Sequence, residues 1–190
     1  MEVTKATERA GGTVRGRVVV GARESLGSVT ALHVAYAEAR ARDAELWVVL
    51  AWQPPLGGPG ARRGGGGTPL LAASRDTAAE RLREVLRTAF GTAPFGTAPP
   101  GVDLAGLTVR GTPGAALVDS VRGPDDLLVV GTGPRGPLLR ALRPSVSRYC
   151  LAHAPCPVLA VPPGPLRADL DALHRRIVWR RPLDAGDLVR

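Results

Sequence analysis

Short apolar runs alternate along this chain with longer stretches in which apolar residues recur at helical spacing. The runs are rich in Val and Leu, and Gly or Pro closes most of them. Such runs are typical of strands that are buried on both faces of a parallel sheet. The predicted strands are residues 17–21, 46–52, 107–110, 127–130 and 158–161.

The stretches between these runs predict helices with one apolar side each. A first helix is expected over 25–42, with Ser25 or Ser28 as its cap. A second is expected over 74–90, a third after the turn at 111–113, and a fourth between the last two strands. The expected inward positions are Val29, Leu32, Tyr36 and Ala39, then Ala78, Leu82, Val85, Leu86 and Ala89, then Leu117, Val118 and Val121. Strands alternating with helices indicate an α/β fold.

The length of 190 residues allows one such domain with tails at both ends. We expect a flexible tail over 1–15, the α/β domain over 16–162 with a mobile Gly/Pro loop at 54–72, and an extension over 163–190. No run of eighteen apolar residues predicts a membrane helix, and the polar first sixteen residues lack the apolar core of a secretion signal. We therefore expect a cytoplasmic protein without membrane contact.

The net charge of +8 comes almost wholly from arginine, since Lys5 is the only lysine. Abundant Ala, Gly and Pro beside arginine indicate a GC-rich coding bias. The arginines are scattered, and few aromatic residues lie among them to stack bases, so nucleic-acid binding is not the expected main function. Two cysteines, Cys150 and Cys156, predict two half-buried thiols in a reducing compartment, and no metal site is expected.

The segment 125–162 carries the expected ligand site. It consists of strand, Gly/Pro loop, helix and strand, and open parallel sheets bind ligands where such a loop leaves the carboxyl end of a strand. Gly131, Ser145 and the sequence 154–158 (Ala-Pro-Cys-Pro-Val) resemble the carboxy-terminal signature of the universal stress protein family. That signature has two further glycines in its phosphate loop, and the spacing puts Pro134 and Pro144 there.

The amino-terminal half resembles the same family. Its first loop, 21–25, follows the pattern Gly-x-Asp-x-Ser but has Arg23 where nucleotide-binding members have an aspartate that holds the adenosine. Ala51 falls on the position that lines the adenine, and the pattern Val-x-Gly-x-Pro recurs at 109–113. The resemblance covers about residues 16–162. We predict a Rossmann-like, doubly wound sheet of five parallel strands in the order 3-2-1-4-5, with helices on both faces.

The resemblance implies a nucleotide site in which backbone N–H groups of the glycine loop and the start of the last helix bind phosphate. Proline has no N–H, so two prolines would remove two donors, worth about 3–6 kcal/mol or two to four decades in affinity. The remaining glycines, or the arginines at 23, 135, 140 and 143, are an alternative means of holding an anion. The candidate site residues are Ala22, Arg23, Ser25, Ala51, Val130, Gly131, Gly133, Pro134, Gly136, Pro144, Ser145, Val146 and Ser147.

Several functions follow as hypotheses. The first is a regulatory stress-response protein with weak or absent ATP binding, paired as a homodimer through 158–161. The alternatives are an ATP or AMP switch with a rearranged glycine loop and, less favoured, a basic surface for nucleic acid. No catalytic array is found, so we expect no enzyme. In the extension, a stripe at Leu166, Leu170, Leu173 and Ile177 predicts a helix that covers its own domain or docks a protein partner.

Overall fold

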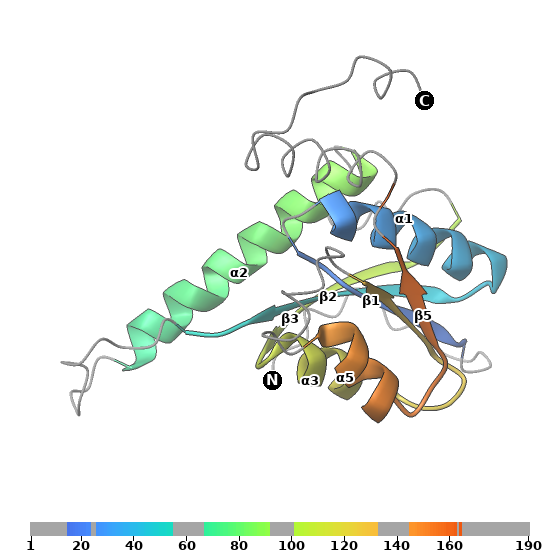
Figure 1. Cartoon of the computed structure of the whole chain (residues 1–190). Coiled ribbons are helices and arrows are strands. Elements are labelled where there is room, and N and C mark those ends of the chain that lie inside the picture. The colour runs from blue at the N-terminus through green and yellow to red at the C-terminus, as the bar shows by residue number, and fades with distance from the viewer. Residues whose placement is uncertain are drawn as a thin grey trace, which may run out of the picture.

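Five parallel strands form the centre of the chain, in the order β3-β2-β1-β4-β5. The computed structural model describes residues 15–23, 26–54, 67–91, 101–132, 145–162 and 164. The strands are β1 (Arg17–Gly21), β2 (Glu45–Trp52), β3 (Leu104–Arg110), β4 (Leu127–Gly131) and β5 (Val158–Val161). The predicted class and strand order are therefore confirmed (Figure 1).

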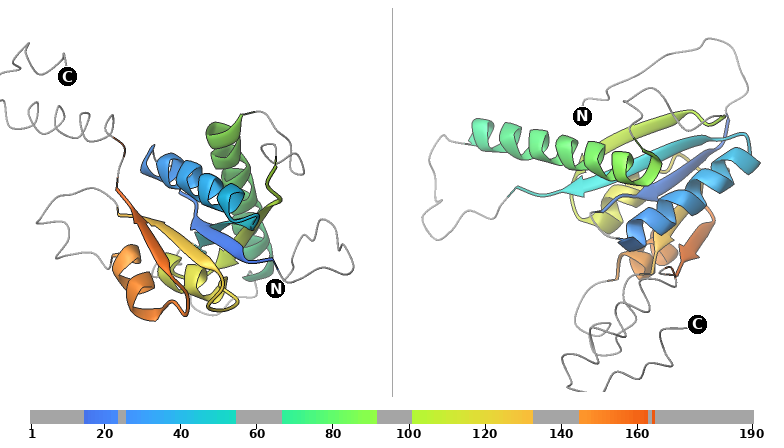
Figure 2. Two further views of the ribbon diagram at one scale, coloured as in Figure 1. Left: turned by 90° about the vertical axis from the view of Figure 1, so that its right-hand side faces the viewer. Right: turned by 90° about the horizontal axis from the view of Figure 1, so that it is seen from above.

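Helices cover both faces of this sheet, as Figures 1 and 2 show. α1 (Leu26–Ala41) and α2 (Gly67–Phe90) lie on one face, and α3 (Pro113–Asp119) and α5 (Val146–His153) on the other. Alternate residues of a strand point to opposite faces. Accordingly Val48 of β2 joins the core beneath α1 and α2, whereas Val49 joins the smaller core beneath α3 and α5. All the predicted inward positions lie in, or pack against, one of these two cores.

Two element boundaries differ from the prediction by more than one residue. α2 begins at Gly67, seven residues before the expected start, so the part of the expected loop from 67 to 72 is helical. The physical reason lies in the sequence: Pro69 falls in the first turn, where no N–H is needed, and the following Leu and Ala residues favour helix. β3 begins at Leu104, three residues early, because β2 offers it a full-length partner from Leu46 to Trp52.

Close approach of α3 to α5 depends on one glycine. A Cβ atom at Gly114 would lie 2.7 Å from Cδ1 of Tyr149, closer than two carbons can pack. Tyr149 in turn stacks on His153, with ring centroids 4.2 Å apart. The absent side chain at Gly114 therefore sets how near α5 can lie to α3 and, through α5, where the helix begins beside β4.

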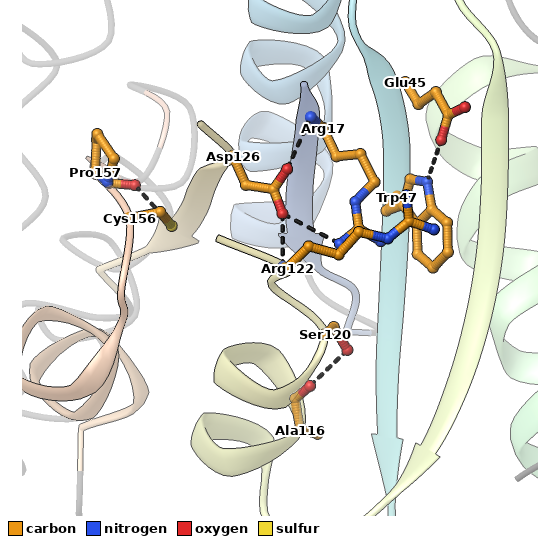
Figure 3. Close-up of polar contacts among 9 residues, drawn as sticks. All are labelled: Arg17, Glu45, Trp47, Ala116, Ser120, Arg122, Asp126, Cys156 and Pro157. Atoms are coloured by element: carbon orange, nitrogen blue, oxygen red, sulfur yellow. Dashed lines mark hydrogen bonds and ion pairs between the residues drawn. The ribbon is translucent and has the colours of Figure 1, made fainter. Parts of the chain in front are cut away.

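A buried ion pair joins the amino ends of β1 and β4 (Figure 3). The Arg17 guanidinium lies 3.1 Å from Oδ2 of Asp126, and both side chains are almost fully buried. Oδ1 of Asp126 accepts the backbone N–H of Arg17 at 3.0 Å, and Oδ2 accepts that of Arg122 at 2.7 Å. Trp47 lies against both arginines, 4.4 Å from Arg17 and 5.4 Å from Arg122. One carboxylate thus holds β1 and the chain entering β4 together.

Beyond β5 the chain turns toward α1. A Cβ atom at Gly164 would lie 3.2 Å from Oγ1 of Thr30 in the first half of that helix. The expectations for the tail at 1–15 and for the helix in the extension lie almost wholly outside the described residues. Within the described ranges, no helix is long and apolar enough to cross a membrane.

Candidate functional site

The candidate site lies at the carboxyl edge of the sheet, where β1 and β4 end side by side. Val20 of β1 pairs with Val129 of β4, so Ala22 and Gly131 stand at one level. The structure places Ala22 and Arg23 after β1, Ala51 near the end of β2, and Val130 and Gly131 at the end of β4. Ser145, Val146 and Ser147 begin α5. The other predicted residues, Ser25, Gly133, Pro134, Gly136 and Pro144, lie outside the described residues.

The two described residues of the loop after β1, Ala22 and Arg23, have already used their backbone donors. The N–H of Ala22 donates to the carbonyl of Val49 at 2.7 Å, which continues the β1–β2 ladder past the strand. The N–H of Arg23 donates to Oγ of Ser28 at 2.9 Å, and Ser28 is buried. Ser28, one of the two predicted caps, thus binds the loop from inside the first turn of α1. Since both N–H groups are bonded within the protein, neither is free for a phosphate.

The serines that begin α5 are used in the same way. Ser145 is the N-cap, and its Oγ accepts the N–H of Arg148 at 3.4 Å. The hydroxyl of Ser147 is buried and donates to the carbonyl of Gly131 at 3.0 Å, across the two ends of the β4–α5 connection. The N–H of Thr132, next along, donates to the carbonyl of Val161 at 2.9 Å. The bridge from Ser147 to Gly131 could not be read from the sequence.

The three remaining predicted residues at this edge, Val130, Val146 and Ala51, are apolar. Val130 is 3% exposed and belongs to the core beneath α3 and α5, and Val146 packs against that core. Ala51 is half-buried and pairs with Val109 of β3. Val130 and Val146 therefore serve packing, and only the exposed side chain of Arg23 brings charge to this set of residues.

Two thiols lie in α5 and just before β5. Cys150 is fully buried, and Cys156 is half-buried with its thiol 3.4 Å from the carbonyl of Pro157; both are free. Burial raises the pKa of Cys150 to about 11, and the nearby Cys156 adds to that shift. Burial also raises the pKa of Cys156. Neither thiol is activated as a nucleophile at neutral pH. Across the described part of the chain, no group of three or more His, Cys, Asp or Glu residues could hold a metal ion.

A cavity of about 230 Å³ opens at the opposite, amino edge of the sheet. Asp126 lines it, but both carboxylate oxygens of that residue are already bonded to Arg17 and Arg122. Ligands of open parallel sheets bind at the other edge. We therefore place the candidate site at the carboxyl edge, away from this cavity.

Comparison with known families decides what this scaffold is. The model of the universal stress protein family matches residues 15–162. The chain belongs to this family. The match begins just before β1 and ends just after β5, so all five strands of the universal stress protein domain are included. The resemblance inferred from the glycine, serine and Ala-Pro-Cys-Pro-Val positions is confirmed.

Solved universal stress proteins share the fold. One, crystallised in complex with cAMP, is 26% identical, with 80% of this chain and 100% of that chain covered and a TM-score of 0.50. The universal stress protein UspA from Lactobacillus plantarum is 19% identical, with 79% and 99% covered and a TM-score of 0.54. A family protein from Burkholderia pseudomallei is 20% identical, with 81% and 100% covered and a TM-score of 0.50. A comparison with curated proteins found no match.

Proposed function

We propose that this universal stress protein is a regulatory protein of the stress response that works through protein contacts and binds adenine nucleotides weakly or not at all. The observation that carries this proposal is the loop after β1. Arg23 stands where nucleotide-binding relatives have an adenosine-binding aspartate, and its N–H is bonded to Ser28. The loop presents an exposed cation instead of a carboxylate to the sugar or base.

The sequence of the β4–α5 connection supports the same conclusion. Pro134 and Pro144 stand where the family signature has glycines, and neither offers an N–H to phosphate. Each charged hydrogen bond lost weakens binding by about 1.5–3 kcal/mol, or one to two decades. The hydroxyl of Ser147 would be a further donor, but it already donates to the carbonyl of Gly131.

The experiment is a thermal-shift titration of the full chain with Mg-ATP, AMP and cAMP. We expect no shift at millimolar ligand. A ligand present at a hundredfold its dissociation constant would stabilise the native state by about 2.7 kcal/mol, which such an assay detects readily. A clear shift with any of the three would refute weak nucleotide binding.

A second function, an adenine-nucleotide switch, is favoured by one finding: the 26% identical relative was crystallised with cAMP. It predicts the opposite outcome of the same titration. In that case Arg23→Asp, which restores the family pattern of the first loop, would strengthen nucleotide binding further. Under the main proposal, Arg23→Asp alone leaves ATP binding weak, because the two prolines remain.

We propose in addition that the protein forms a homodimer through β5. Universal stress proteins often form homodimers. β5 lies at the end of the strand order, with β4 as its single partner in the sheet. The carbonyls of Pro157 and Val161 accept from β4, so the alternate residues, Val158 and Ala160, direct their backbone groups to the open side. Such an edge readily pairs with another strand.

Because the backbone groups of β5 alternate in this way, one substitution can disturb its open side without disturbing its pairing with β4. Ala160→Pro removes an outward N–H and leaves the ladder to β4 intact, since edge strands tolerate proline on their open side. We expect a folded monomer by circular dichroism and analytical ultracentrifugation, against a dimer for the unaltered chain. A dimer that persists in Ala160→Pro would show that another surface pairs the subunits.

A further inference from the structure

The two edges of the sheet differ in their charged residues. Acidic residues lie at, or one or two positions before, the first residues of β2, β3 and β4: Asp43, Glu45, Asp103, Asp125 and Asp126. At the carboxyl edge, the described residues 21–23, 51–54, 110–112, 131–132, 145–148, 161–162 and 164 include no acidic residue. They hold three arginines, Arg23, Arg110 and Arg148, all with exposed side chains. Arg15, Arg17 and Arg122 lie among the acidic residues of the amino edge and offset much of their charge, whereas the charged residues of the described carboxyl edge are all arginines.

The strand register puts these three arginines at nearly one level. Arg110 ends β3 and pairs with Trp52 of β2. Gly21 pairs with Val49, so Arg23 follows β1 close to the level of Ala51 and Trp52. Arg148 follows Ser147, whose hydroxyl is bonded to the last residue of β4. Each arginine comes from a different element, and together they follow the edge from β3 to β4.

The spacing of the strands sets the length of this row. β3 and β1 are two steps apart in the strand order, and neighbouring strands lie about 4.8 Å apart, so Arg110 and Arg23 leave the sheet roughly 10 Å apart. Arg148 lies beyond them, in the first turn of α5. A ligand that carries several phosphate groups in a row can contact all three arginines at once.

The aromatic residues beside the row are occupied within the protein. Trp52, opposite Arg110, packs against the core beneath α1 and α2. Tyr149, next to Arg148, stacks on His153 and lies against Gly114. Proteins that bind single-stranded nucleic acid through bases need free aromatic faces. Since Trp52 is partly buried and Tyr149, although 40% exposed, already stacks on His153, the described part of the carboxyl edge favours recognition of phosphates over stacking of bases.

We propose that Arg23, Arg110 and Arg148 bind an extended chain of phosphates, either inorganic polyphosphate or the backbone of a nucleic acid. The proposal deepens the proposed function, because it rests on the edge having lost tight adenine-nucleotide binding. The chain lies across the carboxyl ends of β3, β2, β1 and β4 and is held by charge, where the family's glycine loop holds phosphate by backbone N–H groups. The site consists of these three arginines.

The test measures binding of end-labelled inorganic polyphosphate to the full chain by fluorescence anisotropy over a range of salt concentrations. Each phosphate neutralised contributes about 0.7–0.9 to the slope of log affinity against log salt. A triple variant, Arg23→Ala with Arg110→Ala and Arg148→Ala, is expected to lower that slope by about 2–3 and the affinity by about a hundredfold or more. Circular dichroism checks that the variants fold.

The matched control removes three arginines elsewhere. Arg42, Arg83 and Arg87 lie just after α1 and along α2 and pair with Glu38, Glu80 and Glu84. Their triple alanine variant has the same net charge as the edge variant and is expected to keep most of the slope. An equal loss of slope in both triple variants would mean that general basicity binds the polyphosphate, and the proposed site would be wrong.

Competitors identify the source of the phosphates. If unlabelled oligo-dT displaces polyphosphate as well as polyphosphate itself does, any phosphate chain is a ligand; if it does not, the ligand is the inorganic chain. Binding of oligo-dT with no binding of polyphosphate would overturn the proposal, since bases would then be required. The proposed function fails on a different result, a thermal shift with ATP. If only the phosphate site is wrong, ATP still gives no thermal shift, and the two triple variants lose the same slope.

Discussion

Removing the carboxylate of Asp126 should be the most damaging single change on the amino side of this sheet. In Asp126→Ala, the guanidinium of Arg17 stays buried without its anion, and the backbone N–H groups of Arg17 and Arg122 lose their acceptor. Nε of Arg17 is also buried without a hydrogen-bond partner. Breaking a buried pair on one side typically costs about 3–5 kcal/mol. That is a large part of the 5–15 kcal/mol or so that stabilises a domain.

The pKa of Arg17 explains why stability falls when Asp126 alone is removed. Burial lowers this pKa, against the opposing effect of Asp126. The folded protein therefore disfavours the charged guanidinium, and its charge destabilises the fold at neutral pH. Asp126 offsets that penalty. The double variant Arg17→Met with Asp126→Ala removes the buried charge as well, so it should unfold at higher urea than Asp126→Ala alone.

Urea unfolding followed by circular dichroism measures these free energies. The control is Glu38→Ala, which breaks the half-exposed pair with Arg42 and should change stability by less than about 0.5 kcal/mol. The reasoning fails if Asp126→Ala loses under about 1 kcal/mol, or if the double variant is no more stable than the single one. Either result would show that water or a local shift replaces the carboxylate.

Two further predictions concern α5 and its neighbours. Gly114→Ala should destabilise the protein by about 1–3 kcal/mol, because the new methyl group meets the ring of Tyr149. The control, Gly123→Ala, has open space around the new methyl group and should leave stability unchanged. Equal urea midpoints for the two variants would contradict this packing. Stability should also fall between about pH 9 and 11, because the unfolded Cys150 thiol ionises at its ordinary pKa of 9.0 while the folded one stays protonated up to about 11. The loss approaches about 2.7 kcal/mol, and Cys150→Ala should lack it in urea unfolding at each pH; an unchanged pH profile in that variant would refute the assignment.

The hydrophobic pattern predicted most of the fold because buried parallel strands have a distinctive sequence. Residues 17–21 and 158–161 were predicted with the bounds that the structure gives. The start of α2 was not, because glycine and proline in its first turn look like a loop, and helix propensity and the first-turn tolerance of proline outweigh that signal. The partnership of Arg17 with Asp126 was also missed, since it joins residues 109 positions apart.

The candidate site was predicted only in part. Its place at the ends of β1 and β4 followed from topology, and the structure brings Arg23, Gly131 and Ser147 to that edge. What each hydroxyl or N–H binds depends on distances of a few tenths of an ångström, which no spacing in the sequence encodes. The bond from Ser28 to the N–H of Arg23 is such a case. The only sequence signal for it was the expectation that Ser28 or Ser25 caps α1.

The hydrogen bond from Ser147 to Gly131 has a consequence for how this family can diversify. It ties together the two ends of the connection that carries the phosphate motif in nucleotide-binding relatives. A loop whose ends are held by the scaffold loses little when its length or composition changes; doubling its length costs only about 0.6 kcal/mol. The sequence of such a connection can be replaced, for example with prolines in place of glycines, while the sheet beneath it keeps its register. Grafting the glycine loop of a nucleotide-binding relative between Gly131 and Ser147 should therefore leave a folded domain with a different ligand.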